Sequence, residues 1–169
     1  LPAPEREGEV VVIVVPHVPK DHPDFMNKPI PSLALLRHVK RKLNEHRLIT
    51  TVLHVLKPRF VEFDVEVEVY RRGGGPHDRL RQAVDRSLKL FCHPLVGGRD
   101  RQGWPFGRSI YKVDLFHVVE EVRDVDVVHR ITLHDVRAGR DVDYLRVADD
   151  ELIFLRNVNV TERSREQII

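Results

Sequence analysis

Residues 61–69 alternate strictly between apolar and acidic side chains, and this pattern constrains the fold more than any other part of the chain. The apolar positions are Val61, Phe63, Val65, Val67 and Val69, and the acidic positions are Glu62, Asp64, Glu66 and Glu68. Successive side chains of a β-strand point to opposite faces of a sheet. The segment therefore predicts a strand that is buried on one face and acidic on the other.

Four carboxylates on one strand face could indicate a metal site or acid–base chemistry. Side chains on the same face of a strand lie roughly 7 Å apart, and no other residues of the sequence converge on these four. We therefore interpret the acidic face as solvated, or as a stripe that contacts a basic partner, rather than as a catalytic centre.

Three segments carry apolar residues at helical spacing and are predicted to form helices. The first follows Ser32, whose hydroxyl can cap a helix; the second ends at His93-Pro94; and the third follows Ser109. The apolar positions are Leu35, Leu36, Val39 and Leu43 in the first helix, Leu80, Ala83, Val84, Leu88 and Phe91 in the second, and Ile110, Val113, Phe116 and Val119 in the third. Each helix therefore has one apolar face that can cover a sheet.

The remaining strands are predicted from β-branched runs and alternation. Residues 9–15 form an uninterrupted apolar run after Glu9, which is typical of a central strand buried on both faces. Over residues 125–133 the same side is expected to carry Val125, Val127, His129, Ile131 and Leu133. Further strands are expected at 49–56, 144–147, 152–155 and 158–160, with a turn at Asp149-Asp150.

The predicted elements follow a strand-helix-strand-strand-helix-strand order, which is ferredoxin-like. We expect an α+β fold in which helices pack on a mainly antiparallel sheet, with an added helix and short C-terminal strands. Residues 1–8 are typical of a linker from an upstream domain, and the chain begins with Leu1 rather than Met. The predicted divisions are 1–8, a domain over 9–134, a short-strand appendage over 135–161 and a polar tail over 162–169.

The segment from Gly97 to Arg108 is predicted to be a shaped loop between two helices. It holds the only Trp of the chain and four of its nine glycines. One interpretation is that Trp104 or Phe106 anchors the loop to the core. The other is that the loop contacts a partner, since Trp and Arg contribute much of the binding energy of interfaces. The residues that could make such a contact are Trp104, Phe106, Arg99, Arg101 and Arg108.

The hydrophobic share of 41% and the charged share of 32% favour a globular chain over a disordered one. Its 28 basic and 26 acidic residues leave a net charge of +2, which argues against a dedicated nucleic-acid binder. The alternative is a module that binds nucleic acid or another anionic surface through the basic helix at residues 37–47. No apolar run is long enough to cross a bilayer, and no signal-peptide pattern opens the chain.

A third hypothesis is a small enzyme that uses some of the ten histidines. The candidate groups are His17, Asp21, His22 and Asp24 in a proline-rich loop, His129, His134 and Asp135 near one strand, and the adjacent Cys92-His93 pair. None of them has the spacing of a known metal site, and Cys92 is expected to be a small buried hydrophobe. We therefore expect neither a cofactor nor a metal.

Residues 8–133 resemble the C-terminal part of baseplate J-like wedge proteins of contractile phage tails and related injection systems. The first matching stretch is a valine-rich strand ending in Val14-Val15-Pro16, followed by Pro31-Ser32 and a helix. The second is the Thr50-Thr51-Val52 strand, Lys57-Pro58 and the alternating strand. The third and most specific is a helix ending in His93-Pro94-Leu95, then Gly97-Gly98, Gly103-Trp104-Pro105-Phe106-Gly107-Arg108, and a helix that leads to Val125-Asp126.

The resemblance implies a structural role without enzymatic activity or cofactor. Wedge subunits bind one another and the hub, form the ring at the end of the tail, and transmit the change that triggers contraction. It also implies assembly in the cytoplasm, membership of a phage virion or phage-tail-like particle, several copies in a ring, and no membrane insertion.

Overall fold

The computed structural model describes residues 8–73 and 77–163, so residues 1–7 of the predicted linker, residues 74–76 and residues 164–169 of the predicted tail lie outside the described residues. The chain divides into two compact units, 1–59 and 60–169. The boundaries predicted at residues 8, 134 and 161 do not coincide with this division. Each unit is described by itself.

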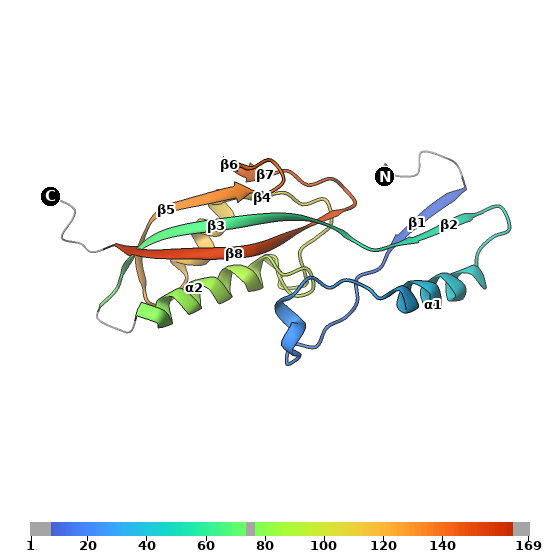
Figure 1. The fold of residues 1–169 in the computed structure, drawn as a ribbon, viewed down its shortest axis with the longest axis horizontal. Coiled ribbons are helices and arrows are strands. Elements are labelled where there is room, and N and C mark those ends of the chain that lie inside the picture. The colour runs from blue at the N-terminus through green and yellow to red at the C-terminus, as the bar shows by residue number, and fades with distance from the viewer. Residues whose placement is uncertain (1–7, 74–76, 164–169) are drawn as a thin grey trace. The chain divides into compact units, whose positions relative to one another are not determined.

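The first unit contains a parallel strand pair and a helix (Figure 1). Strand β1 (Glu9–Ile13) pairs with β2 (Val52–Leu56), and between them come the single-turn helix η1 (Pro23–Met26) and α1 (Leu33–Asn44). The start of α1 is as predicted, because the Ser32 hydroxyl accepts a hydrogen bond of 3.1 Å from the Leu35 amide. The half-buried residues Leu35, Leu36 and Val39 form its apolar stripe, and α1 packs on β2.

The prediction that residues 9–15 form a central strand is wrong. Among the described residues β1 pairs only with β2, and Val10 is 43% exposed. β-branched side chains favour extended backbone whatever the number of neighbouring strands, so the run predicts a strand but not its place in a sheet. The predicted α+β class and element order are confirmed. The pairing nevertheless differs from a ferredoxin-like sheet, in which another strand separates the first two.

The second unit is built on a four-stranded sheet in the order β6-β5-β3-β8. The strands are β3 (Arg59–Arg71), β5 (Val125–Asp135), β6 (Arg140–Val142) and β8 (Glu151–Arg163), and a small separate sheet pairs β4 (Ile110–Tyr111) with β7 (Tyr144–Leu145). β5 is antiparallel to both β3 and β6. β8 runs in the same direction as β3, since Asp64 bonds to Arg156 and Arg71 bonds to Glu162 (Figure 1).

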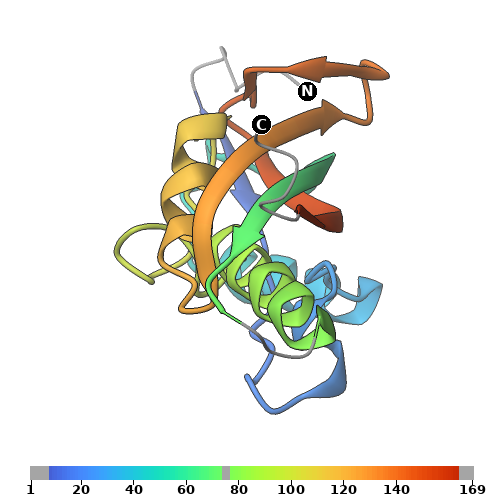
Figure 2. The same cartoon turned by 90° about the vertical axis from the view of Figure 1, so that its left-hand side faces the viewer.

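Helices α2 (His77–Phe91) and α3 (Lys112–Glu120) pack on one face of this sheet (Figure 2). The alternation predicted for β3 is confirmed, because all five of its odd-numbered apolar residues from Val61 to Val69 are at most 3% exposed. They pack with buried residues of the two helices, which are Leu80, Val84 and Leu88 of α2 and Leu115 and Val119 of α3. Burial of this continuous apolar layer is the main stabilising contribution in the unit.

Strand β5 departs from its predicted alternation at a β-bulge. The register with β3 shifts between Glu68 and Val69, so the side chain of Val127 is 51% exposed and His129 lies beside Glu68. Val128 packs against the core instead. The prediction that Val127 and His129 lie on the same side as Val125, Ile131 and Leu133 was therefore wrong, because one extra residue in the strand reverses the alternation beyond it.

Residues 151–163 form one continuous strand rather than the two short strands that were predicted, and the strand also includes Glu162 and Arg163 of the predicted tail. Its alternation breaks at Arg156 and Asn157, which both bond to Asp64 of β3. The third helix begins at Lys112 rather than after Ser109, because Ile110 and Tyr111 pair with β7 and the Asp114 carboxylate accepts a hydrogen bond from the Tyr111 amide.

Candidate protein-interaction surfaces

The Gly/Trp loop, residues 97–108, folds back on the end of α2 through backbone hydrogen bonds. The Gly98 amide donates to the Phe91 carbonyl at 2.7 Å, and the Gly97 amide donates to the His93 carbonyl at 2.8 Å. A Cβ atom on Gly97 would lie 2.3 Å from the Phe91 carbonyl oxygen, so this close backbone approach requires glycine. The loop is therefore a rigid part of the second unit, as its composition predicted.

Trp104 anchors this loop to the core. Its side chain is 2% exposed, and its ring meets that of Phe91 edge-to-face with centroids 5.5 Å apart. The indole Nε1–H donates to the Arg108 carbonyl at 2.9 Å, while the Arg108 guanidinium lies 5.1 Å from the ring centroid. The prediction that one aromatic residue anchors the loop is confirmed for Trp104, whose ring is buried in the core.

The outward side of the loop carries Phe106, Arg99 and Arg101. Phe106 is 38% exposed, and Arg101 adopts the left-handed conformation, with φ of 55°. The Arg99 guanidinium donates to the Asp114 carboxylate at 2.9 Å, although the Arg99 side chain is 65% exposed. Arg99 is thus held against α3, whereas Phe106 and Arg101 present an apolar and a cationic group to the exterior.

The acidic face of β3 is largely paired with basic residues from neighbouring strands. Asp64 accepts hydrogen bonds from Arg156 Nε at 3.0 Å and from both the backbone N and the Nδ2 of Asn157 at 3.1 Å. The hydrogen bond from the Arg156 guanidinium lowers the pKa of Asp64 below its ordinary value of 3.8. Glu68 pairs with Arg163, and Glu62 also has an interaction partner within the chain.

Glu66 differs from its neighbours on this stripe. Its side chain is exposed, and within the described residues it makes no ion pair. The stripe is thus a nearly charge-balanced sheet face with one available carboxylate. Sequence reasoning missed this balance because Arg156 and Arg163 follow the acidic residues by more than ninety positions, and no local pattern pairs them.

A stacked tyrosine pair is a surface feature that sequence reasoning also missed. Tyr111 of β4 lies directly opposite Tyr144 of β7; their ring centroids are 5.5 Å apart and both residues are 49% exposed. The two residues are far apart in the sequence and belong to two-residue strands, so no periodic pattern in the sequence could predict their contact.

The first unit presents a basic face on α1. Arg37, Lys40, Arg41, Asn44 and Glu45 line a shallow, open depression along this helix. Lys42 pairs with Glu45 at 3.0 Å. This is the surface that the nucleic-acid alternative requires.

The described residues bring together no group of three or more His, Cys, Asp or Glu side chains that could hold a metal ion. Cys92 is buried as predicted, and burial together with the Asp114 charge raises the pKa of its thiol. His93 is also buried, and its Nδ1 accepts a hydrogen bond from the Leu95 amide at 3.1 Å. These two residues therefore support the turn after α2 rather than forming a nucleophile and base.

Within the part of the chain that the structure describes, no helix is both long enough and apolar enough to cross a membrane.

His134 Nδ1 lies 2.9 Å from Asp141, which joins β5 to β6 at the exposed sheet face. Because the bulge places His129 beside Glu68, both histidines approach the acidic face.

Comparison with solved structures finds a similar fold in a chain of the anti-feeding prophage (AFP) baseplate, determined by cryo-EM with 6-fold symmetry. The alignment has a TM-score of 0.56 at 14% sequence identity and covers 89% of this chain. It covers 29% of the AFP chain, so the present chain spans less than a third of that length. No protein-family model matches the chain, and no curated protein matches it. The likeness shows a shared fold.

Proposed function

We propose that the protein is a structural wedge subunit, of the baseplate J-like kind, in the baseplate of a contractile tail or injection system. The observation that carries this proposal is the fold that 89% of the chain shares with a chain of the AFP baseplate. The residue pattern of the three resembling stretches supports the same role. In this role the protein assembles with other proteins and transmits the contraction trigger, with no enzymatic step or cofactor.

The most specific of the three resembling stretches, the Gly/Trp loop, contains residues that the packing of the second unit requires. Gly97 admits no side chain, and Trp104 seals the loop against α2. The motif is thus explained by the packing of the second unit, and its outward residues are available for contacts. This supports a role in which a rigid domain presents a shaped loop to neighbouring subunits.

The partners in this proposal are other wedge subunits and hub or sheath-proximal proteins, in several copies around a ring. Assembly would take place in the cytoplasm, and the product would be a phage virion or phage-tail-like particle. The proposed interface residues remain Trp104, Phe106, Arg99, Arg101, Arg108, Glu62, Asp64, Glu66 and Glu68. Within this set, exposure favours Phe106, Arg101 and Glu66 as direct contacts, whereas Trp104 acts by positioning the loop.

The proposal is tested by deleting the gene in its native host and examining contractile particles by electron microscopy. We expect particles with a complete baseplate to disappear and to return when the wild-type gene is supplied. Normal particles in the deletion strain would contradict the proposal.

Complementation with variants tests the interface residues. Phe106→Ala combined with Arg101→Glu, or Glu66→Lys, is expected to reduce particle number while leaving the unfolding midpoint unchanged. Glu121→Lys is the matched control, since Glu121 is exposed on the end of α3 and makes no ion pair within the described residues. Equal particle numbers for all variants would refute the interface assignment without refuting the baseplate role.

A further inference from the structure

Helix α1 carries its cations on the side opposite its apolar stripe. The depression along it is lined by residues at positions i, i+3, i+4, i+7 and i+8, which share one helix face. Its apolar residues contact β2 and are half-buried, whereas Arg37, Lys40 and Arg41 are exposed. The basic side is therefore not required for packing within the first unit.

Most of this positive charge is uncompensated. Arg37 and Lys40 make no ion pair within the described residues, and Arg41 contacts only the ring nitrogen of His38, at 3.1 Å. The one carboxylate that lines the depression, Glu45, is already paired with Lys42. An approaching anionic group would thus meet free cationic side chains.

The charge of the whole chain conceals this asymmetry. Residues 8–59 contain nine Lys and Arg but four Asp and Glu, although the complete sequence has a net charge of only +2. Near-neutrality, which argued against anionic partners at the level of composition, therefore does not apply to the first unit taken by itself.

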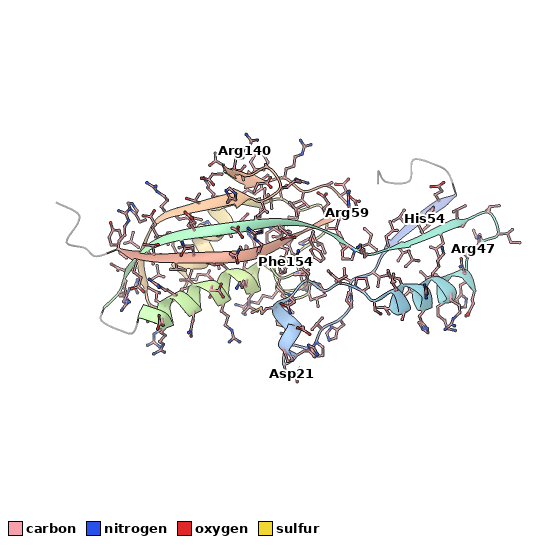
Figure 3. The ribbon with its side chains drawn as sticks, viewed as in Figure 1. Asp21, Arg47, His54, Arg59, Arg140 and Phe154 are labelled. Carbon is pink, nitrogen blue, oxygen red and sulfur yellow. The ribbon has the colours of Figure 1, made fainter. Side chains whose placement is uncertain are left out.

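An exposed apolar tip follows α1. Leu48 is 74% exposed and Ile49 is 99% exposed. The turn is closed by a 3.0 Å hydrogen bond from the Thr51 amide to the Leu48 carbonyl and by a bond from the Arg47 guanidinium to the Thr51 carbonyl. Figure 3 labels Arg47 at this turn, beyond the end of α1. The two aliphatic side chains are therefore held in a preformed turn beside a guanidinium group.

We propose, resting on the proposed baseplate role, that the basic face of α1 and the Leu48–Ile49 tip form one docking surface for an acidic protein partner in the particle. The partner presents carboxylates to Arg37, Lys40 and Arg41 and an apolar pocket to Ile49. Carboxylates three or four residues apart on a helix, or two apart on a strand, match the spacing of these cations.

The combination of charge and apolar tip favours protein over nucleic acid or lipid. A phosphate backbone needs cations but no aliphatic side chain, whose exposure to water is unfavourable until a pocket covers it. Binding to a bilayer surface grows with buried apolar area, and two aliphatic side chains supply little. An aliphatic tip in a hydrogen-bonded turn, with Arg47 beside it and the cations of α1 on the same unit, suits an apolar pocket with an acidic rim, because preorganisation reduces the entropy lost on binding.

Carbodiimide cross-linking of purified particles, followed by mass spectrometry, tests this contact because the reagent joins lysine amines to neighbouring carboxylates. We expect Lys40 to be coupled to an Asp or Glu of a different polypeptide. The internal Lys112–Asp143 pair, at 2.8 Å, is the positive control for the chemistry. Coupling of Lys40 only within its own chain, with the control pair coupled, would overturn the proposal.

Particle incorporation of variants provides the second readout. Arg37→Glu with Lys40→Glu, and separately Ile49→Asp, should lower incorporation by about tenfold, since like charges or a buried charge oppose docking. The control, Arg81→Glu with Arg86→Glu, makes the same charge change on exposed positions of α2 and should stay within about twofold of wild type. Unchanged incorporation of the α1 and Ile49 variants would overturn the proposal.

Two further results would distinguish a protein partner from lipid or nucleic acid, and a failed docking surface from a failed baseplate role. Binding of the purified protein to phosphatidylserine vesicles or to a short duplex DNA, lost in the Arg37→Glu, Lys40→Glu variant, would assign the surface to lipid or nucleic acid and refute the protein partner. Absence of the wild-type protein from particles would refute the baseplate role itself. A failed docking surface would leave wild-type incorporation intact, so the two failures are distinguishable.

Discussion

Removing the Asp64 carboxylate is expected to weaken the junction between β3 and β8. This one side chain accepts hydrogen bonds from two guanidinium nitrogens of Arg156 and from the backbone and side-chain amides of Asn157. The contacts span the point where the alternation of β8 breaks, so in Asp64→Ala the Asn157 amide loses its acceptor. The substitution therefore tests what holds the C-terminal strand in the sheet.

The size of the effect follows from exposure. Hydrogen bonds to a charged group contribute roughly 1.5–3 kcal/mol in protected sites, whereas exposed ion pairs contribute roughly 0.2–1 kcal/mol. The Asp64 side chain is 22% exposed and that of Arg156 is 44% exposed, which places the pair between these limits. We expect Asp64→Ala to lower the free energy of unfolding by about 2 kcal/mol, and Asp64→Asn, which keeps an acceptor, by about 1 kcal/mol.

The effect should depend on pH in one direction. The pKa of Asp64 is lowered in the folded protein, so its stabilising contribution is complete above 3.8 and is lost as pH falls from there through the folded pKa. The difference between wild type and Asp64→Asn should therefore be constant near neutral pH and shrink below 3.8. A difference that grew on acidification would contradict this account.

Urea unfolding followed by the fluorescence of Trp104, the only Trp, measures these differences. Glu66→Ala is the matched control on the same strand face, and its effect should stay within about 0.5 kcal/mol. A loss below about 0.5 kcal/mol for Asp64→Ala would refute the argument that this carboxylate holds β8.

Three further experiments test other parts of the structure. Gly97→Ala should lower the free energy of unfolding by more than about 2 kcal/mol, because its Cβ would meet the Phe91 carbonyl. Gly73→Ala has no atom within 4 Å of its Cβ and should lower it by about 1 kcal/mol through its positive φ. Thermal unfolding of the two variants compares these losses. Val128→Asp should unfold the protein at room temperature while Val127→Asp is tolerated, which circular dichroism would show; the reverse result would place the β5 bulge elsewhere. The Cys92 thiol should react with a disulfide reagent only as fast as the protein unfolds, and rapid reaction of the native protein would contradict its burial.

Local pattern was sufficient for the elements whose determinants are local. The alternation of residues 61–69 predicted both the strand and its buried face, and Ser32 marked the start of α1. In each case neighbouring residues carry the whole signal. The anchoring role of an aromatic in the Gly/Trp loop was predictable for the same reason, because glycine, proline and Trp constrain backbone and packing together.

The features that were mispredicted or missed depend on contacts between distant segments. The bulge in β5 exists only relative to β3, and the break in β8 is stabilised by Asp64, ninety-two positions before Arg156. The valine run at residues 10–15 predicts extended backbone but contains no information on how many strands flank it. The same limitation applies to the acidic stripe, whose charge balance becomes visible only when β8 is placed beside β3.

Sedimentation of a native lysate through a density gradient, with immunoblotting of the fractions for this protein, tests the baseplate role most directly. We expect the protein in fast-sedimenting particles that also contain tail sheath. Recovery of the protein only in slowly sedimenting fractions, from cells that contain assembled contractile particles, would contradict the proposed function.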